Sequence, residues 1–145
     1  MTNPARHHMA YLSCPLSNIP EEELAKLREY YHQLGEVLEN AGYVAYLPHI
    51  AGDPLLVPDL TEKQIDTIDR TAVSHSSLMV VYMGLPSHGA GQEIEMARTQ
   101  HMPIIMMSNT GDYVSRLPRG SSMLFRHVIS ETREESLEGL AKALA

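Results

Sequence analysis

The chain has 145 residues, of which 43% are hydrophobic and 20% charged, so we expect one globular domain, residues 1–145, with its own core. Its formal net charge of −7 at pH 7 argues against a general nucleic-acid or membrane-surface binder, which would carry a basic patch. Cys14 is the only cysteine, which excludes a disulfide within the chain. With neither a signal-peptide pattern nor an apolar run of membrane length, we expect a cytoplasmic protein.

Strand-like and helix-like segments alternate from the N-terminus. Residues 8–13 predict a first strand, and the apolar period after it predicts a helix that runs to about residue 40. Asn18 and Glu21 have the spacing of a capping box at the start of that helix, and Gly42 predicts its end. A second strand is predicted at 43–47, followed by a loop at 50–60 that is long enough to be functional.

The second half of the chain repeats this alternation. Thr61 and Gln64 predict a capping box that opens a second helix. A third strand at 78–83, a helix at 92–101 and a fourth strand at 103–107 follow. After an irregular segment at 109–122, we expect a fifth strand at 123–129 and an amphipathic helix at 131–144.

This pattern predicts an α/β fold with a doubly wound, flavodoxin- or Rossmann-like sheet of five mostly parallel strands in the order 2-1-3-4-5. Ligands of such folds bind outside the carboxyl ends of the strands where the strand order reverses. In this order the reversal falls between strands one and three. The loops 13–18 and 85–91 should therefore meet there.

The most informative segment is 86–93, Pro-Ser-His-Gly-Ala-Gly-Gln-Glu, which joins the third strand to a helix. Gly89 and Gly91 would let the backbone approach a ligand, and with Ser87 and the free N–H groups of the helix start they could bind phosphate. Glu93 would follow in the first helical turn, where the helix dipole favours its charged form. A glycine turn alone is a weak signal, but with this glutamate it predicts chemistry on a phosphorylated sugar.

Three further side chains are candidates for the same site. Asp69 lies on the apolar face of the second helix, where a carboxylate is costly unless it is paired or used; a structural role is its alternative. Tyr11 and His49 lie near the ends of strands one and two, although Tyr11 could be a core residue and His49 a surface residue. Neither the other histidines nor Cys14 have the spacing of a metal or nucleophile site, and we predict no metal and no cofactor.

The segment 86–97, read as Pro-Ser-x-Gly-x-Gly-x-Glu-x-x-x-Ala, resembles the nucleoside 2-deoxyribosyltransferase superfamily, most closely its 2′-deoxynucleoside 5′-monophosphate N-glycosidases. The weaker matches are Tyr11, His49, Asp69 and Ser115-Arg116-x-x-Arg119-Gly120.

The resemblance implies a role for each matching residue. Glu93 would be the nucleophile that attacks the anomeric carbon, Asp69 would orient it and support proton transfer, and Tyr11 would position the glutamate and the sugar. Ser87, with the backbone around it, would hold the 5′-phosphate. Ser115 would reach the phosphate bound in the site of a neighbouring subunit, which implies a homodimer. The small molecule that each site binds would be a nucleotide substrate.

The sequence departs from the family pattern at several positions. Glu95 replaces a glycine two residues after the nucleophile, and Ser77 replaces an aspartate before the third strand. The loop 13–17 lacks the glycine and arginine that the family uses near the phosphate, and Ser17 and Asn18 are the candidates to replace them. The substrate preference could therefore have moved towards ribonucleotides or modified bases.

We therefore expect a hydrolase that cleaves the N-glycosidic bond of (deoxy)nucleoside 5′-monophosphates to the free base and (deoxy)ribose 5-phosphate. Two alternatives stay open. A transferase that exchanges bases on deoxynucleosides would need no phosphate contact, and a regulatory module would bind a nucleotide without cleaving it.

Overall fold

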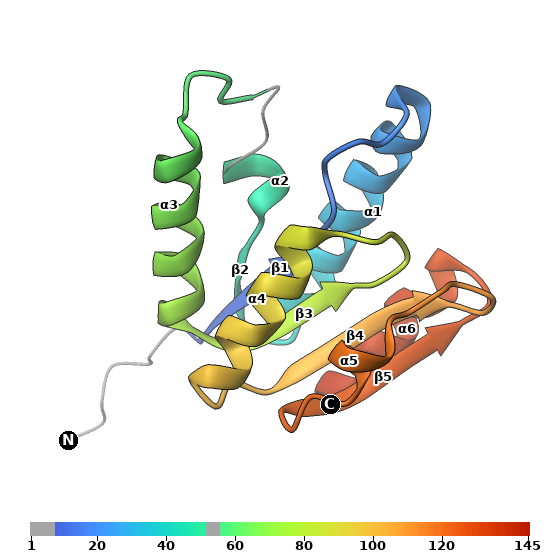
Figure 1. Ribbon diagram of the computed structural model, residues 1–145. Coiled ribbons are helices and arrows are strands. Elements are labelled where there is room, and N and C mark those ends of the chain that lie inside the picture. Colours follow the sequence, from blue (N-terminus) through green and yellow to red (C-terminus); the bar gives the residue numbers. More distant parts are fainter. Residues whose placement is uncertain (1–7, 52–55) are drawn as a thin grey trace.

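Five strands form one parallel sheet, with β2 at one edge and β5 at the other (Figure 1). The computed structural model describes residues 8–51 and 56–145. In chain order the strands are β1 (Met9–Ser13), β2 (Val44–Tyr46), β3 (Ser76–Tyr82), β4 (Ile104–Asn109) and β5 (Leu124–Ser130). They pair in parallel in the order β2-β1-β3-β4-β5, which confirms the predicted α/β fold and strand order.

Helices cover both faces of the sheet (Figure 1). α1 (Glu21–Asn40) and α6 (Arg133–Leu144) pack on one face, and α3 (Glu62–His75) and α4 (His88–Thr99) pack on the other. Two short helices, α2 (Pro48–Ala51) and α5 (Arg116–Arg119), lie in the stretches after β2 and β4. No helix of the described residues combines the length and apolar character needed to cross a membrane.

The core has two layers because successive side chains of a strand point to opposite faces of the sheet. Leu12 and Val80 belong to the cluster under α1 and α6, whereas Tyr11 and Val81 belong to the cluster under α3 and α4. The chain thus leaves β1 towards one face and β3 towards the other. This is the switch point of a doubly wound sheet, and it places the ends of β1 and β3 side by side.

Local signals set most of the helix boundaries. The capping box predicted for α3 is confirmed: Oγ1 of Thr61 accepts a hydrogen bond from the Gln64 N–H at 3.1 Å, and Oε1 of Gln64 accepts one from the Thr61 N–H at 2.9 Å. Gly42, with φ of +95°, follows the end of α1 as predicted.

The prediction that Asn18 caps α1 is wrong. α1 begins only after Pro20, and no side chain caps it. Asn18 instead adopts a φ of +57°, a left-handed conformation that asparagine tolerates better than most residues. It therefore turns the loop rather than starting the helix.

The predicted start of α4 is also wrong, by one helical turn. The helix begins at His88, and Oγ of Ser87 accepts a hydrogen bond from the Ala90 N–H at 3.2 Å. Gly89 and Gly91 are therefore in the first turn of the helix rather than in a loop, and Glu93 is in the second turn. Each glycine weakens a helix by about 1 kcal/mol relative to alanine. The serine cap and the burial of Ala90 oppose that loss.

Candidate functional site

Five polar side chains converge at the carboxyl ends of β1 and β2, under the helices of one face. Tyr11 and Ser13 come from β1, Tyr46 from β2, Asp69 from α3 and Glu93 from α4. The structure therefore brings together the three predicted catalytic residues Tyr11, Asp69 and Glu93. Sequence reasoning missed Ser13 and Tyr46, which are the last residues of β1 and β2.

Each of these five side chains has a buried polar atom without a hydrogen-bond partner among the described residues. The atoms are the hydroxyl oxygens of Tyr11, Ser13 and Tyr46, Oδ1 of Asp69 and Oε2 of Glu93. A buried polar group left unpaired costs about 1–3 kcal/mol, and native proteins contain few of them. Five such atoms in one place are typical of a site that receives a polar ligand or ordered water.

The Glu93 carboxyl group is the electrostatic centre of this cluster. Its pKa is raised to about 7, mainly by burial and to a smaller extent by the negative charge of Asp69. The hydroxyl groups of Tyr11 and Ser13 act in the opposite direction, although neither reaches the geometry of a full hydrogen bond. The expectation that the helix dipole would favour the charged form is thus outweighed by burial, since Glu93 lies beyond the first turn.

The other titratable groups of the cluster respond to the same surroundings. Burial raises the pKa of the Tyr11 hydroxyl, and Glu93, Asp69 and Tyr46 raise it further. Burial also raises the pKa of Asp69, with a smaller contribution from Asp66. The cluster therefore holds two carboxyl groups that keep their protons to a higher pH than ordinary carboxyl groups do.

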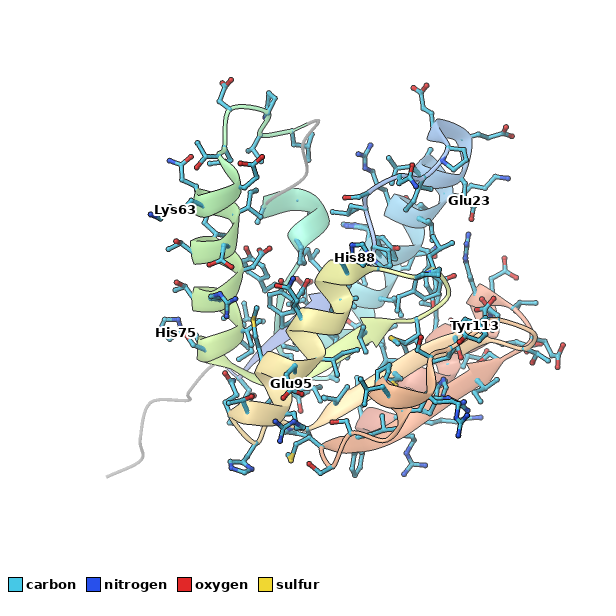
Figure 2. The ribbon with its side chains drawn as sticks, viewed as in Figure 1. Glu23, Lys63, His75, His88, Glu95 and Tyr113 are labelled. Carbon is cyan, nitrogen blue, oxygen red and sulfur yellow. The ribbon has the colours of Figure 1, made fainter. Side chains whose placement is uncertain are left out.

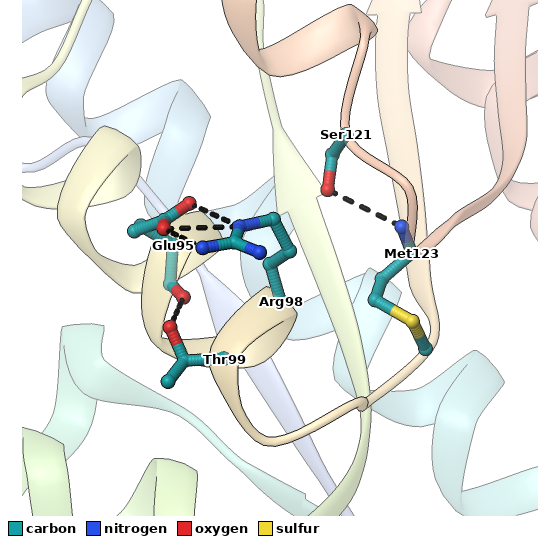
Figure 3. A network of polar contacts seen from close by, with 5 residues as sticks. All are labelled: Glu95, Arg98, Thr99, Ser121 and Met123. Atoms are coloured by element: carbon teal, nitrogen blue, oxygen red, sulfur yellow. Dashed lines mark hydrogen bonds and ion pairs between the residues drawn. The ribbon is translucent and has the colours of Figure 1, made fainter.

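Glu95 provides the contrast on the same helix. It is exposed, and its carboxylate accepts hydrogen bonds from the Arg98 guanidinium, including one at 2.8 Å from Nε (Figure 3). That bond lowers the pKa of Glu95. Glu95 is thus part of a surface ion pair, and it faces away from the cluster around Glu93.

The first turn of α4 lies directly beside the Glu93 carboxyl group. A Cβ atom built on Gly89 would lie 3.6 Å from Oε1 of Glu93 and 3.8 Å from Oγ of Ser87. His88 is the first residue of α4 (Figure 2). Among the described residues, no hydrogen bond uses the backbone N–H groups of His88 and Gly89. An anion bound by these N–H groups and the Ser87 hydroxyl would therefore lie close to Glu93.

A cavity of about 310 Å³ opens beside this turn. Ser87, His88 and Gly91 line one side of it, and the segment that contains Tyr113 and Ser115 lines the other. The structure thus brings Ser87 and Ser115 to one cavity within a single chain. Whether Ser115 also reaches a neighbouring subunit stays a prediction.

Of the remaining sequence candidates, Ser17 does not join the cluster. Ser17 is exposed, and none of the hydrogen bonds of the described residues connects it to the others. His49 lies in α2, but its side chain is outside the described part of the chain. The Cys14 thiol has a pKa raised by burial and by Glu93, which suppresses the reactive thiolate.

The described residues contain no group of three His, Cys, Asp or Glu side chains that could hold a metal ion. A second cavity, of about 480 Å³, lies between α3 and α4 and is lined by Arg70, Gln92, Glu95 and Gln100. It follows the outer sides of these helices and does not include Asp69 or Glu93.

Among the solved structures with this arrangement of strands and helices are the following three proteins. A CMP N-glycosidase from Clostridium botulinum, BcmB, superposes with a TM-score of 0.68 at 20% identity, over 91% of this chain and 96% of its own. A conserved protein from Enterococcus faecalis V583 has a TM-score of 0.70 at 17% identity, over 93% and 98%. A 2-deoxyribosyltransferase from Bacillus psychrosaccharolyticus has a TM-score of 0.63 at 14% identity, over 89% and 90%.

No protein-family model matches the chain, and the search of curated proteins found no match. The solved structures nevertheless include an N-glycosidase and a 2-deoxyribosyltransferase, the two kinds of enzyme that the sequence resemblance named. They confirm this resemblance at the level of the fold.

Proposed function

We propose that this chain is an enzyme that cleaves the N-glycosidic bond of nucleoside 5′-monophosphates, with Glu93 as the nucleophile. The observation that carries the proposal is the position of Glu93: a buried carboxyl group with an unpaired oxygen, next to a second carboxyl group and to the free N–H groups of a helix start. The shared fold with an N-glycosidase and a 2-deoxyribosyltransferase supports the same class of chemistry.

The phosphate would bind at the start of α4. The N–H groups of His88 and Gly89 are directed out of the helix, where the partial positive charge of the dipole favours an anion. The Ser87 hydroxyl accepts one bond from Ala90 and still has a proton to donate to a phosphate oxygen. Holding the phosphate in this way fixes the sugar next to Glu93, so that binding energy far from the reacting bond serves catalysis.

The first chemical step would transfer the sugar to the enzyme. A carboxylate oxygen of Glu93 forms a bond to C1′ while the bond between C1′ and the base nitrogen breaks, and the bonding electron pair leaves with the base. Asp69, whose pKa is raised by burial, donates the proton that neutralises the leaving base. The positive charge that develops on the sugar is stabilised by the Glu93 carboxylate.

The second step would release the sugar phosphate. Water attacks C1′ of the glycosyl ester, Asp69 accepts a proton from that water, and Glu93 leaves as a carboxylate. If a second base attacks in place of water, the product is a new nucleotide and the reaction is a transfer. The same residues would carry both outcomes.

The test is base release, measured by chromatography, from ribo- and deoxyribonucleosides with and without the 5′-phosphate. Glu93→Gln should lose turnover by several orders of magnitude and still bind nucleotides. The matched control is Glu95→Gln, which changes a glutamate two residues away on the exposed side of the same helix. Turnover that survives in Glu93→Gln would overturn the mechanism.

The panel also separates the alternatives. Release from unphosphorylated nucleosides, increased by an added second base, would favour the transferase. Tight nucleotide binding without any base release would favour a regulatory module.

A further inference from the structure

Tyr46 has the same position on β2 that Tyr11 has on β1. The two residues are direct partners in the parallel pairing of the strands, so their side chains leave the same face of the sheet. Their rings stack with centroids 5.2 Å apart and planes inclined by 19°. Two parallel rings from adjacent register positions bring their hydroxyl groups to the same region.

The Tyr46 hydroxyl faces the carboxyl groups of the site. Its oxygen is buried and has no hydrogen-bond partner among the described residues. Besides burial, which acts most strongly, the charges of Asp69 and then Glu93 raise the pKa of Tyr46 to about 12. Asp69 thus affects the Tyr46 hydroxyl more than Glu93 does, whereas Glu93 has the larger effect on Tyr11.

A phenylalanine at position 46 would stack on Tyr11 without leaving a buried oxygen unpaired. The hydroxyl therefore indicates a partner that the described residues do not provide. Oδ1 of Asp69, its neighbour, is also unpaired. One group that both accepts a hydrogen bond from Tyr46 and donates one to Asp69 would pair both atoms.

A sugar hydroxyl is such a group, because it is a donor and an acceptor at once. A phosphate dianion has no proton to donate to Oδ1 of Asp69. We propose that Tyr46 is a substrate-binding residue whose hydroxyl, together with Asp69, binds a hydroxyl group of the substrate's sugar. The proposal rests on the proposed function, since it names which part of a nucleotide this side of the site recognises.

The experiment compares the binding of ribose 5-phosphate with that of its 2-deoxy and 3-deoxy analogues, by calorimetry, to the wild-type chain and to Tyr46→Phe. We expect Tyr46→Phe to weaken the binding of ribose 5-phosphate about tenfold and to leave one analogue unaffected, the one that lacks the recognised hydroxyl. Tyr43→Phe is the matched control, because Tyr43 packs against the cluster on the opposite face of the sheet.

Three results would overturn the proposal: an equal loss for all three sugars, no loss for any of them, or no sugar binding to the wild-type chain. The first two would mean that Tyr46 has a structural role or holds only water. Base release by the wild-type chain is a separate readout. If Tyr46 discriminates between the sugars but the wild-type chain releases no base, this proposal stands and the glycosidase activity is refuted. If base is released but Tyr46 does not discriminate between the sugars, only the glycosidase activity stands.

Discussion

Glu93→Gln should make the protein more stable while it removes activity. In the folded chain the pKa of Glu93 is about 7, against an ordinary value of 4.5, so its charged form is disfavoured by folding. At about 1.4 kcal/mol for each pH unit of difference, the charge costs about 3 kcal/mol when fully developed. Glutamine has nearly the same shape and carries no charge, so it avoids this cost.

The difference in free energy of unfolding between Glu93→Gln and the wild type should depend on pH. Below pH 4.5 the folded and unfolded chains both hold the proton, and the wild type and Glu93→Gln should have similar free energies of unfolding. Between pH 4.5 and pH 7 only the folded wild type retains the proton, so its stability falls as the pH rises. At pH 8 the variant should therefore be more stable than the wild type by about 3 kcal/mol.

Urea unfolding at pH 4.5 and at pH 8 measures this difference. The chain has seven tyrosines and no tryptophan, so tyrosine fluorescence or far-ultraviolet circular dichroism is the suitable signal. With a slope near 2 kcal/mol per molar urea, the midpoint at pH 8 should rise by about 1.5 M. Glu95→Gln removes an exposed carboxylate and is the control. A variant of Glu93 that is no more stable at pH 8 than at pH 4.5, relative to wild type, would refute the assigned burial and pKa.

Two further predictions concern activity. Asp69→Asn removes a negative charge that raises the pKa of Glu93, so the acid limb of kcat/KM should move to lower pH; Tyr11→Phe removes a group that lowers this pKa, so the limb should move to higher pH. Both should lower kcat, and pH profiles that move in the same direction would contradict the assignment. Ser87→Ala should raise KM for monophosphates more than for nucleosides, and loss of the helix cap should cost about 1 kcal/mol in urea unfolding. Equal changes in KM for the two substrates would argue against a phosphate contact.

The parts of the fold that the sequence predicted well depend on local signals. The strands appear as short apolar runs, and the capping box of α3 is complete within Thr61–Gln64. The start of α4 was misplaced because Gly89 and Gly91 lower helix propensity. Two features of the sequence do indicate the true start of α4. Ser87 is a suitable N-cap, and Ala90, Ile94 and Ala97, which are all buried, have helical spacing. Tertiary packing outweighs the low helix propensity of the glycines here, and helix propensity alone does not predict tertiary packing.

The sequence predicted three of the five residues of the candidate site, but neither the other two nor the raised pKa of Glu93. Asp69 and Glu93 stood out because a carboxyl group on an apolar face or after a glycine turn requires an explanation. Ser13 and Tyr46 gave no such signal, because a serine or tyrosine in a strand is ordinary. What identifies them is the lack of a partner for a buried oxygen, and that depends on how β1, β2, α3 and α4 pack together.

The start of α4 at His88, rather than at residue 92 as predicted, affects how the site would work. The same helix would present the phosphate-binding N–H groups at His88 and Gly89 and the nucleophile at Glu93. Five residues at 1.5 Å rise separate His88 from Glu93 by about 7.5 Å along the axis. Had the helix begun at residue 92, the glycines would have belonged to a loop able to shift relative to the carboxyl group. Because both groups lie on one rigid element, the distance between the bound phosphate and the attacking oxygen would be set by helix geometry, and the packing of Ala90 and Ile94 holds it in place.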